Sequence, residues 1–290
     1  MELPVIVGVD GSGPSLTATD WAADEAALRG LPLKVLYGSR WAYYEGPALA
    51  VDLGGPPAVV GADDIVDAAV RRARLRRPGL EVTADVAPDA AEELLVREGR
   101  NAALLVLGVS GRGAAAERVL GSVSLTVAGR ADCAVVLVHG HDAGPEPPVP
   151  ADERVVVGLG GGAEEGAVVR FAAEEARLRG VPLEVVRAWK RPAYVLLGHP
   201  LSGTEPDRAE ETRAVEALEA VLAELPPELK VYGRTEEGPA RRVLTAAAQD
   251  AGLLVVGARR RADQRTPHLG RVAHTVLHRS ACPLAVVPHR

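Results

Sequence analysis

The sequence is poor in residues that stack on nucleic-acid bases and in residues that cross-link chains. Its 290 residues include one Phe, three Trp and five Tyr, and the formal net charge is −6. Few aromatic platforms together with a negative charge argue against a nucleic-acid binder. Two Cys are too few for a disulfide framework, so we expect a reducing compartment.

Long apolar runs are missing as well. No stretch reaches about 18 apolar residues without a charge, which argues against a membrane span. The first residues, MELPVIVGVDGSG, already have the pattern of a strand and a turn, with no basic segment followed by a long apolar one. These features predict a soluble cytoplasmic protein without a signal peptide, which has neither a membrane nor a nucleic acid among its partners.

Short apolar runs alternate with helical patterns along the first half. Strands are predicted at residues 5–9, 33–37, 80–86, 104–107 and 134–139, and helices at 15–29, 63–77, 89–100 and 122–130. Ser15 is expected to cap the first helix, and the Gly- and Pro-rich residues 45–62 predict a loop. This β-α-β-α alternation predicts a parallel sheet with helices on both faces.

The second half repeats the first. WAADEAALRGLPLKVL, which begins at Trp21, recurs 150 residues later as FAAEEARLRGVPLEVV from Phe171, and LLVLG at Leu104 recurs as LLVVG at Leu253. A near-constant offset over the whole half predicts a duplicated domain. The expected boundaries are residues 1–140 for the first domain, 141–150 for a Gly- and Pro-rich linker and 151–290 for the second domain.

The stretch 104–124, LLVLGVSGRGAAAERVLGSVS, joins a buried strand to a helix through several glycines. Glycines let the backbone turn tightly, and a helix N-terminus gathers free N–H groups and positive potential. This combination predicts a phosphate site. In a doubly wound sheet of order 3-2-1-4-5, ligands bind beyond the carboxyl ends of strands one and four, so Asp10 is expected at the same crevice.

Asp10 has two interpretations. Its carboxylate can accept hydrogen bonds from ribose hydroxyls or from a base amine. It can equally stabilise its own turn through an Asx bond to the backbone. The residues alone leave both interpretations open.

The spacing Gly108-x2-Gly111-x9-Gly121-Ser122 resembles the nucleotide signature of the universal stress protein family, and Asp10 after the first strand matches as well. The resemblance covers both halves, as in the tandem two-domain form of the family. It implies two Rossmann-like (adenine nucleotide alpha hydrolase-like) α/β domains, each a five-stranded parallel sheet of order 3-2-1-4-5 with helices on both faces. It also implies ATP as the ligand, with or without Mg²⁺, and a stress-response or regulatory role through nucleotide-dependent conformation or partner binding.

By this resemblance the ATP-binding residues all lie in the first half. Gly8 and Asp10 line the adenosine side, and the backbone near Gly38 contacts adenine. Ribose and phosphates are surrounded by Gly108, Ser110, Gly111, Arg112, Gly121, Ser122, Val123 and Ser124. Members of the family also pair through their fifth strands, which implies an internal pseudo-dimer of the two halves and leaves a homodimer open.

The second half keeps the loop length of the signature but not its chemistry. Gly160 stands in the place of Asp10, Arg260 in the place of Gly111 and Arg271 in the place of Ser122. Arg260 places a bulky side chain where a phosphate would approach the backbone. We therefore expect ATP to bind the first half only. The alternative is an anion site of another kind, built from Arg259, Arg260, Arg261 and Arg271.

Catalytic signals are weak. The sequence has no GxxxxGK[ST] or GxSxG motif and no evident general base for a γ-phosphate, so we expect no enzyme, or at most a slow ATPase. His274 and His278 share a helix face but lack further metal ligands, and Cys133 and Cys282 are expected as small buried fillers. The alternative functions are a nucleotide-free scaffold and an adenylate-chemistry enzyme on a related fold.

Overall fold

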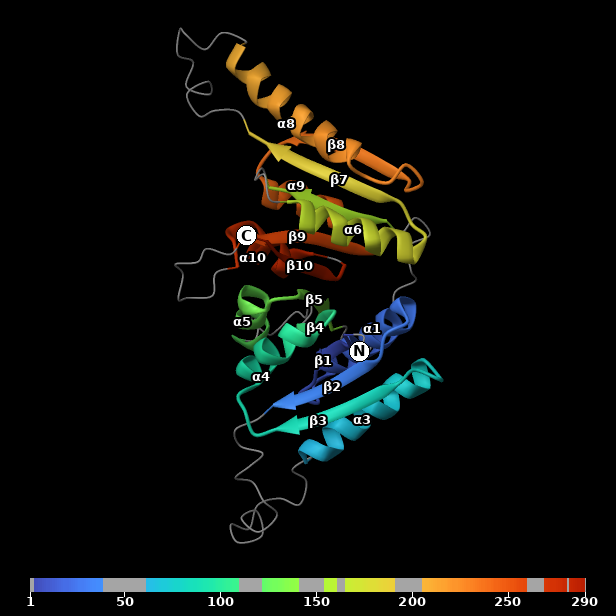
Figure 1. Cartoon of the computed structure of the whole chain (residues 1–290). Coiled ribbons are helices and arrows are strands. Elements are labelled where there is room, and N and C mark those ends of the chain that lie inside the picture. The colour runs from blue at the N-terminus through green and yellow to red at the C-terminus, as the bar shows by residue number, and fades with distance from the viewer. Residues whose placement is uncertain are drawn as a thin grey trace. The chain divides into compact units, whose positions relative to one another are not determined.

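The structure is a computed structural model that describes residues 3–38, 61–109, 122–140, 154–160, 165–190, 205–259, 269–280 and 282–289. These residues form two compact units, the first within residues 3–140 and the second within residues 154–289 (Figure 1). The loop expected at residues 45–62 lies outside the described residues, apart from residues 61 and 62.

The first unit contains the strands β1 (Val5–Gly8), β2 (Leu33–Gly38), β3 (Val82–Ala87), β4 (Leu104–Val109) and β5 (Ala134–His139). Its described helices are α1 (Gly13–Arg29), α3 (Ala62–Arg76), α4 (Ala91–Glu98) and α5 (Ser122–Arg130), with a short 3-10 helix η1 (Gly99–Asn101) after α4. The strand order is β3-β2-β1-β4-β5 and every pairing is parallel, which confirms the predicted order 3-2-1-4-5.

The second unit repeats this arrangement. Its strands are β6 (Val155–Leu159), β7 (Leu183–Trp189), β8 (Val231–Glu237), β9 (Leu253–Arg259) and β10 (Leu284–His289). Its described helices are α6 (Gly166–Arg179), α8 (Glu205–Ala223), α9 (Ala240–Ala247) and α10 (Arg271–Arg279), with a 3-10 helix η2 (Ala248–Asp250). The order β10-β9-β6-β7-β8 is the order of the first unit, with β6 in the place of β1.

The strands in the middle of each sheet are apolar on both faces because helices cover both sides, whereas the edge strands β3 and β8 carry exposed polar residues. Val5, Val7, Leu104 and Val106 are fully buried in the centre of the first sheet. The helices α1 and α3 pack together on one face, and α4 and α5 pack together on the other (Figure 1). Unbroken apolar runs such as LLVL at residue 104 are therefore central strands.

The first helix begins two residues before the predicted start, and its N-cap is Ser12 rather than Ser15. The Ser12 hydroxyl accepts a hydrogen bond from the Ser15 backbone N–H at 3.3 Å, and the Ser15 hydroxyl donates to the Ser12 carbonyl at 2.9 Å. Pro14 explains the earlier start, because its ring fixes φ near the helical value and suits the first turn. The helix ends at Arg29, and Gly30 caps it in a left-handed conformation with φ of 67°.

A buried ion pair at the end of this helix is repeated in the second unit. Glu25 is 1% exposed and accepts a hydrogen bond from Arg29 Nε at 2.5 Å. Glu175 is fully buried and accepts from Arg179 Nη2 at 2.9 Å. Because an unpaired buried carboxylate is costly, this Glu and Arg spacing is a structural part of the repeated sequence.

Candidate functional site

The strands β1 and β4 are neighbours, and their carboxyl ends form the edge where ligands bind in this type of sheet. Gly8 lies opposite Leu107 in the parallel register. The next residue of the first strand, Val9, donates its backbone N–H to the Leu36 carbonyl at 2.9 Å. The chain segments that carry Gly8, Asp10 and Gly108 therefore meet at one edge, as predicted from the sequence.

Asp10 lies in the turn between β1 and α1, where its side chain is exposed. Its Oδ1 accepts hydrogen bonds from the Ser12 backbone N–H at 2.9 Å and from the Ser12 hydroxyl at 2.6 Å. The Asx interpretation is therefore confirmed. Both bonds end on the same oxygen, so Oδ2, which accepts nothing from the described residues, can still receive a hydrogen bond from a ligand.

Gly108 lies where β4 meets the first turn of α1. A Cβ atom at this position would lie 2.3 Å from the Pro14 carbonyl oxygen and 2.7 Å from the Ser15 nitrogen. Both atoms belong to the backbone, so neither can move aside at low cost. Glycine is thus required here because it lets the N-terminus of α1 rest directly against the end of β4.

Gly8 and Gly38 also have packing reasons to be glycine. A Cβ on Gly8 would lie 2.7 Å from Leu107 Cδ2, and one on Gly38 would lie 3.0 Å from Ala91 Cα in the first turn of α4. The adenosine contacts expected for these two residues stay predictions.

The N-terminal turn of α5 is tied to the same edge of the sheet. Ser124 is 6% exposed, and its hydroxyl donates to the Gly108 carbonyl oxygen at 3.4 Å. Ser122, the first residue of the helix, has an exposed side chain, and Val123 is half-buried. This arrangement leaves the Ser122 hydroxyl in reach of a ligand, whereas the Ser124 hydroxyl already has a partner. The other predicted site residues lie outside the described residues: Ser110, Gly111, Arg112 and Gly121.

At the equivalent edge of the second unit, a side chain of the protein lies where a ligand is expected in the first unit. The Gly160 backbone N–H donates to Glu165 Oε1 at 2.7 Å, so a carboxylate of the protein itself lies at the end of β6. A Cβ on Gly257, the counterpart of Gly108, would lie 2.8 Å from the His289 ring rather than against a helix backbone. The sequence pattern did not indicate Glu165, because no motif spacing marks a side chain that folds back on its own strand.

The sequence of each half matches the model of the Universal stress protein family, over residues 2–139 and 153–288. The chain belongs to this family. A universal stress protein of Mycobacterium tuberculosis strain H37Rv is 33% identical over 292 residues, which cover 97% of this chain and 96% of the relative. Another from the same strain is 30% identical over 298 residues, 98% of this chain and 96% of the relative.

A solved universal stress protein from Archaeoglobus fulgidus DSM 4304 has the same fold. Its crystal structure and this chain cover 98% of each other with a TM-score of 0.70 and 17% sequence identity. The tandem arrangement of two universal stress protein domains follows from the two matches to the family model, over residues 2–139 and 153–288.

Other reactive side chains among the described residues of this universal stress protein include a histidine pair and two cysteines. Among the described residues, no three His, Cys, Asp or Glu side chains are grouped so that they could hold a metal ion. The rings of His274 and His278 lie 4.7 Å apart on one helix face, as predicted. Burial raises the pKa of the Cys282 thiol to about 11, consistent with a buried filler, whereas Cys133 is half-exposed. No helix of the described ranges is long and apolar enough to cross a membrane.

Proposed function

We propose that this universal stress protein binds ATP in its first unit only, and that nucleotide occupancy sets its conformation or its choice of partner. The observation that carries the proposal is the meeting of Asp10, the end of β4 and the N-terminus of α5 at one edge of the first sheet. The two domains, residues 1–140 and 151–290, then have different roles.

The chemistry of this edge suits a nucleoside with attached phosphates. Oδ2 of Asp10 is an acceptor for a ribose hydroxyl. The backbone N–H groups in the first turn of α5, together with the Ser122 hydroxyl, are donors for phosphate oxygens, and the helix dipole favours their negative charge. Any Mg²⁺ would come with the phosphates, because Mg²⁺ is bound mainly by phosphate oxygens and water at such sites.

The second unit lacks these properties. Glu165 accepts from Gly160 where a ligand would be expected, and its carboxylate repels phosphate. This supports the half-site prediction made from Arg260 and Arg271. The same reasoning supports slow ATP hydrolysis at most, since the described residues at the first site supply only Asp10 as a titratable side chain.

Calorimetric titration of ATP in the presence of Mg²⁺ tests the proposal. The wild type should bind one ATP per chain, Gly111→Arg should bind none detectably, and Asp10→Ala should bind about tenfold more weakly, because one hydrogen bond to a charged group is lost. Arg271→Ser in the second unit is the matched control and should leave stoichiometry and affinity unchanged.

Unchanged affinity in both first-unit variants would overturn the site assignment, and two ATP per chain would overturn the half-site proposal. Mass spectrometry of nucleotide released from the purified protein provides a second measurement. If neither method finds nucleotide, the chain is a nucleotide-free scaffold instead.

A further inference from the structure

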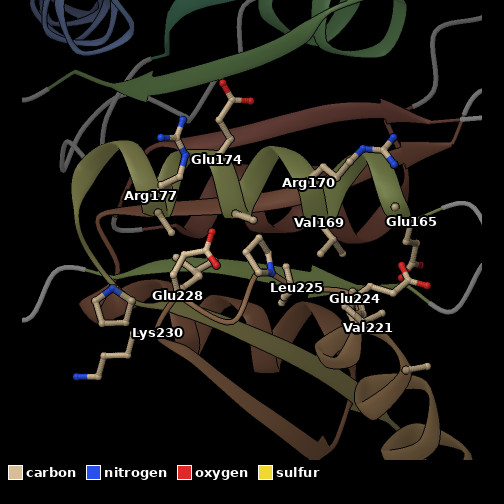
Figure 2. Close-up of a pocket in the computed structure, with 18 of the residues that line it drawn as sticks. Glu165, Val169, Arg170, Glu174, Arg177, Val221, Glu224, Leu225, Glu228 and Lys230 are labelled. Atoms are coloured by element: carbon tan, nitrogen blue, oxygen red, sulfur yellow. The ribbon is translucent and has the colours of Figure 1, made fainter.

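A groove of about 1400 Å³ runs between α6 and α8 in the second unit (Figure 2). Its lining extends from Glu165 at the start of α6 to Gly180 at its end, which is about 20 Å at 1.5 Å per helical residue. Val169 extends from α6 toward the side of the groove where Val221 and Leu225 lie. The groove is therefore long, and apolar side chains lie along its middle.

The sequence explains why the second unit has this groove. In the first unit α3 is bound to α1 by ion pairs: Arg72 Nε donates to Asp20 Oδ1 at 2.7 Å and Arg76 Nε to Asp24 Oδ2 at 2.8 Å. Val82 in β3 and Val231 in β8 occupy the same sheet position, opposite Leu33 and Leu183 respectively.

These two valines align the segments that precede them. Ten residues before the valine, Arg72 in the first unit corresponds to Val221 in the second, and six residues before it Arg76 corresponds to Leu225. Neither apolar side chain can form the ion pair that its counterpart makes. Both side chains are half-buried, and the part that remains exposed to water is stabilised when an apolar group covers it.

Arg187 lines the groove near the carboxyl end of β7, and one of its N–H donors has no hydrogen-bond acceptor among the described residues. Its Nη1 donates to the Leu159 carbonyl oxygen at 3.2 Å, whereas its Nε is buried and has no acceptor among the described residues. A guanidinium has five N–H donors, and a carboxylate matches its geometry.

The charge of the groove agrees with an anionic ligand. Five Arg and Lys side chains line it against four Glu, so its formal charge is positive. Of these acids, Glu165 already accepts a hydrogen bond from the Gly160 N–H.

We propose that this groove binds a long-chain carboxylate, with the carboxylate at Arg187 and the chain along Val169, Val221 and Leu225. A slender chain fits a groove that follows the whole length of α6, and its apolar surface covers the side chains that no ion pair shields. This site is separate from the nucleotide site, because all of its residues belong to the second unit.

Displacement of a fluorescent fatty-acid probe tests the proposal on the full chain. Saturated carboxylates of increasing length, used below their micelle concentrations, should bind about fourfold more tightly for each added CH₂ until the groove is full. The wild type should bind each carboxylate about tenfold more tightly than the alcohol of equal length. Arg187→Gln should remove this difference in affinity without weakening the binding of the alcohol.

Leu225→Arg, which places a cation where Arg76 stands in the first unit, should abolish binding. Leu75→Ser on α3 of the first unit changes an 82% exposed leucine and is the matched control, with unchanged binding expected. Circular dichroism and ATP stoichiometry report separately whether each variant is folded, so failure of one proposal does not decide the other.

Three results would overturn the proposal. The first is an affinity that does not depend on chain length. The second is an Arg187→Gln variant that keeps the preference for carboxylate over alcohol. The third is a concentration-dependent dimer in light scattering that Leu225→Arg dissociates, because a second copy of the chain would then occupy the groove.

Discussion

The two units share a strand order and a buried ion pair in the first helix, but they differ in a contact between two helices and at the edge of the sheet. In the first unit, arginines join α3 to α1, and a helix backbone rests on Gly108 at the strand edge. In the second, apolar residues stand in place of those arginines, and Glu165 lies at the edge. The buried strands thus specify the fold in both halves, whereas the helix contacts and the strand edge can change after duplication.

The largest difference concerns the glycine near the carboxyl end of the fourth strand of each unit, Gly108 in β4 and Gly257 in β9. Gly108→Ala places a Cβ against immobile backbone, so we expect the unfolding free energy of the first unit to fall by about 3 kcal/mol. In Gly257→Ala the new Cβ would lie 2.8 Å from the His289 ring and 3.1 Å from Val168 Cγ2, which are side-chain atoms and not backbone, so we expect a smaller loss of about 1 kcal/mol in the second unit.

Hydrogen exchange of the amides in β4 and β9 measures the stability of each unit separately. A single unfolding midpoint cannot do so for a chain with two domains. Equal losses in both variants would show that the edge contacts do not distinguish the units.

A smaller difference is expected from the ion pairs between α1 and α3. Asp24 accepts hydrogen bonds from Arg76 Nε at 2.8 Å and from Arg77 Nε at 2.7 Å. Asp24→Asn should destabilise the first unit by about 1 kcal/mol, and the effect should shrink in 1 M salt because these pairs are partly exposed. Asp85→Asn is the control: its carboxylate is 3.9 Å from Lys34 Nζ, and we expect a change of about 0.5 kcal/mol or less. A salt-independent loss at Asp24 would point to packing instead of charge.

The smallest expected difference between the units is in how their stability changes at acid pH. Lys34 Nζ donates to Glu98 Oε2 at 2.9 Å in the first unit, and this hydrogen bond, with the charge of Lys34, lowers the pKa of Glu98 from its ordinary 4.5. In the second unit the strand position of Lys34 holds a carboxylate, Glu184, which accepts from Arg154 and Arg234.

Since the folded-state pKa of Glu98 is lowered, its stabilisation is complete above pH 4.5 and is lost as the pH falls through the lowered value. Glu98→Gln should remove this part of the acid dependence of the first unit, about 1 kcal/mol or less. Exchange rates of β4 amides between pH 3 and 6 measure it, after correction for intrinsic rates. An unchanged acid dependence in the variant would assign it to other carboxylates.

Sequence reasoning predicted the alternation of strands and helices and the duplication, because these depend on apolar periodicity and on a repeat over long stretches. The strand order followed from the resemblance to the family, which rests on motif spacing. Sequence reasoning also placed Asp10 and Gly108 at one edge. It gave the wrong cap for α1, because Ser12 and Ser15 are both suitable side chains and only the position of Pro14 in the first turn decides between them.

Side-chain partners were harder to predict. The arginines at the end of α3 have the sequence pattern of a favourable charge cluster at a helix terminus, yet Arg72, Arg76 and Arg77 bind acids of α1, more than forty residues earlier. A periodic pattern shows which face of a helix is polar but not which distant side chain faces it. For the same reason the sequence did not predict the contact of Glu165 with Gly160 or the groove beside Val221.

The register of the central strands has a consequence for the order in which the protein forms during synthesis. Val5 pairs with Leu104, so the middle of the first sheet closes only after about a hundred residues have left the ribosome. Its last strand ends at His139, before any strand of the second unit has been made. Val155, the first residue of the similar strand β6, follows His139 by 16 residues. At a synthesis rate of about 5–20 residues per second, the first unit therefore has about 1–3 seconds to fold before β6 emerges and competes for the same neighbours.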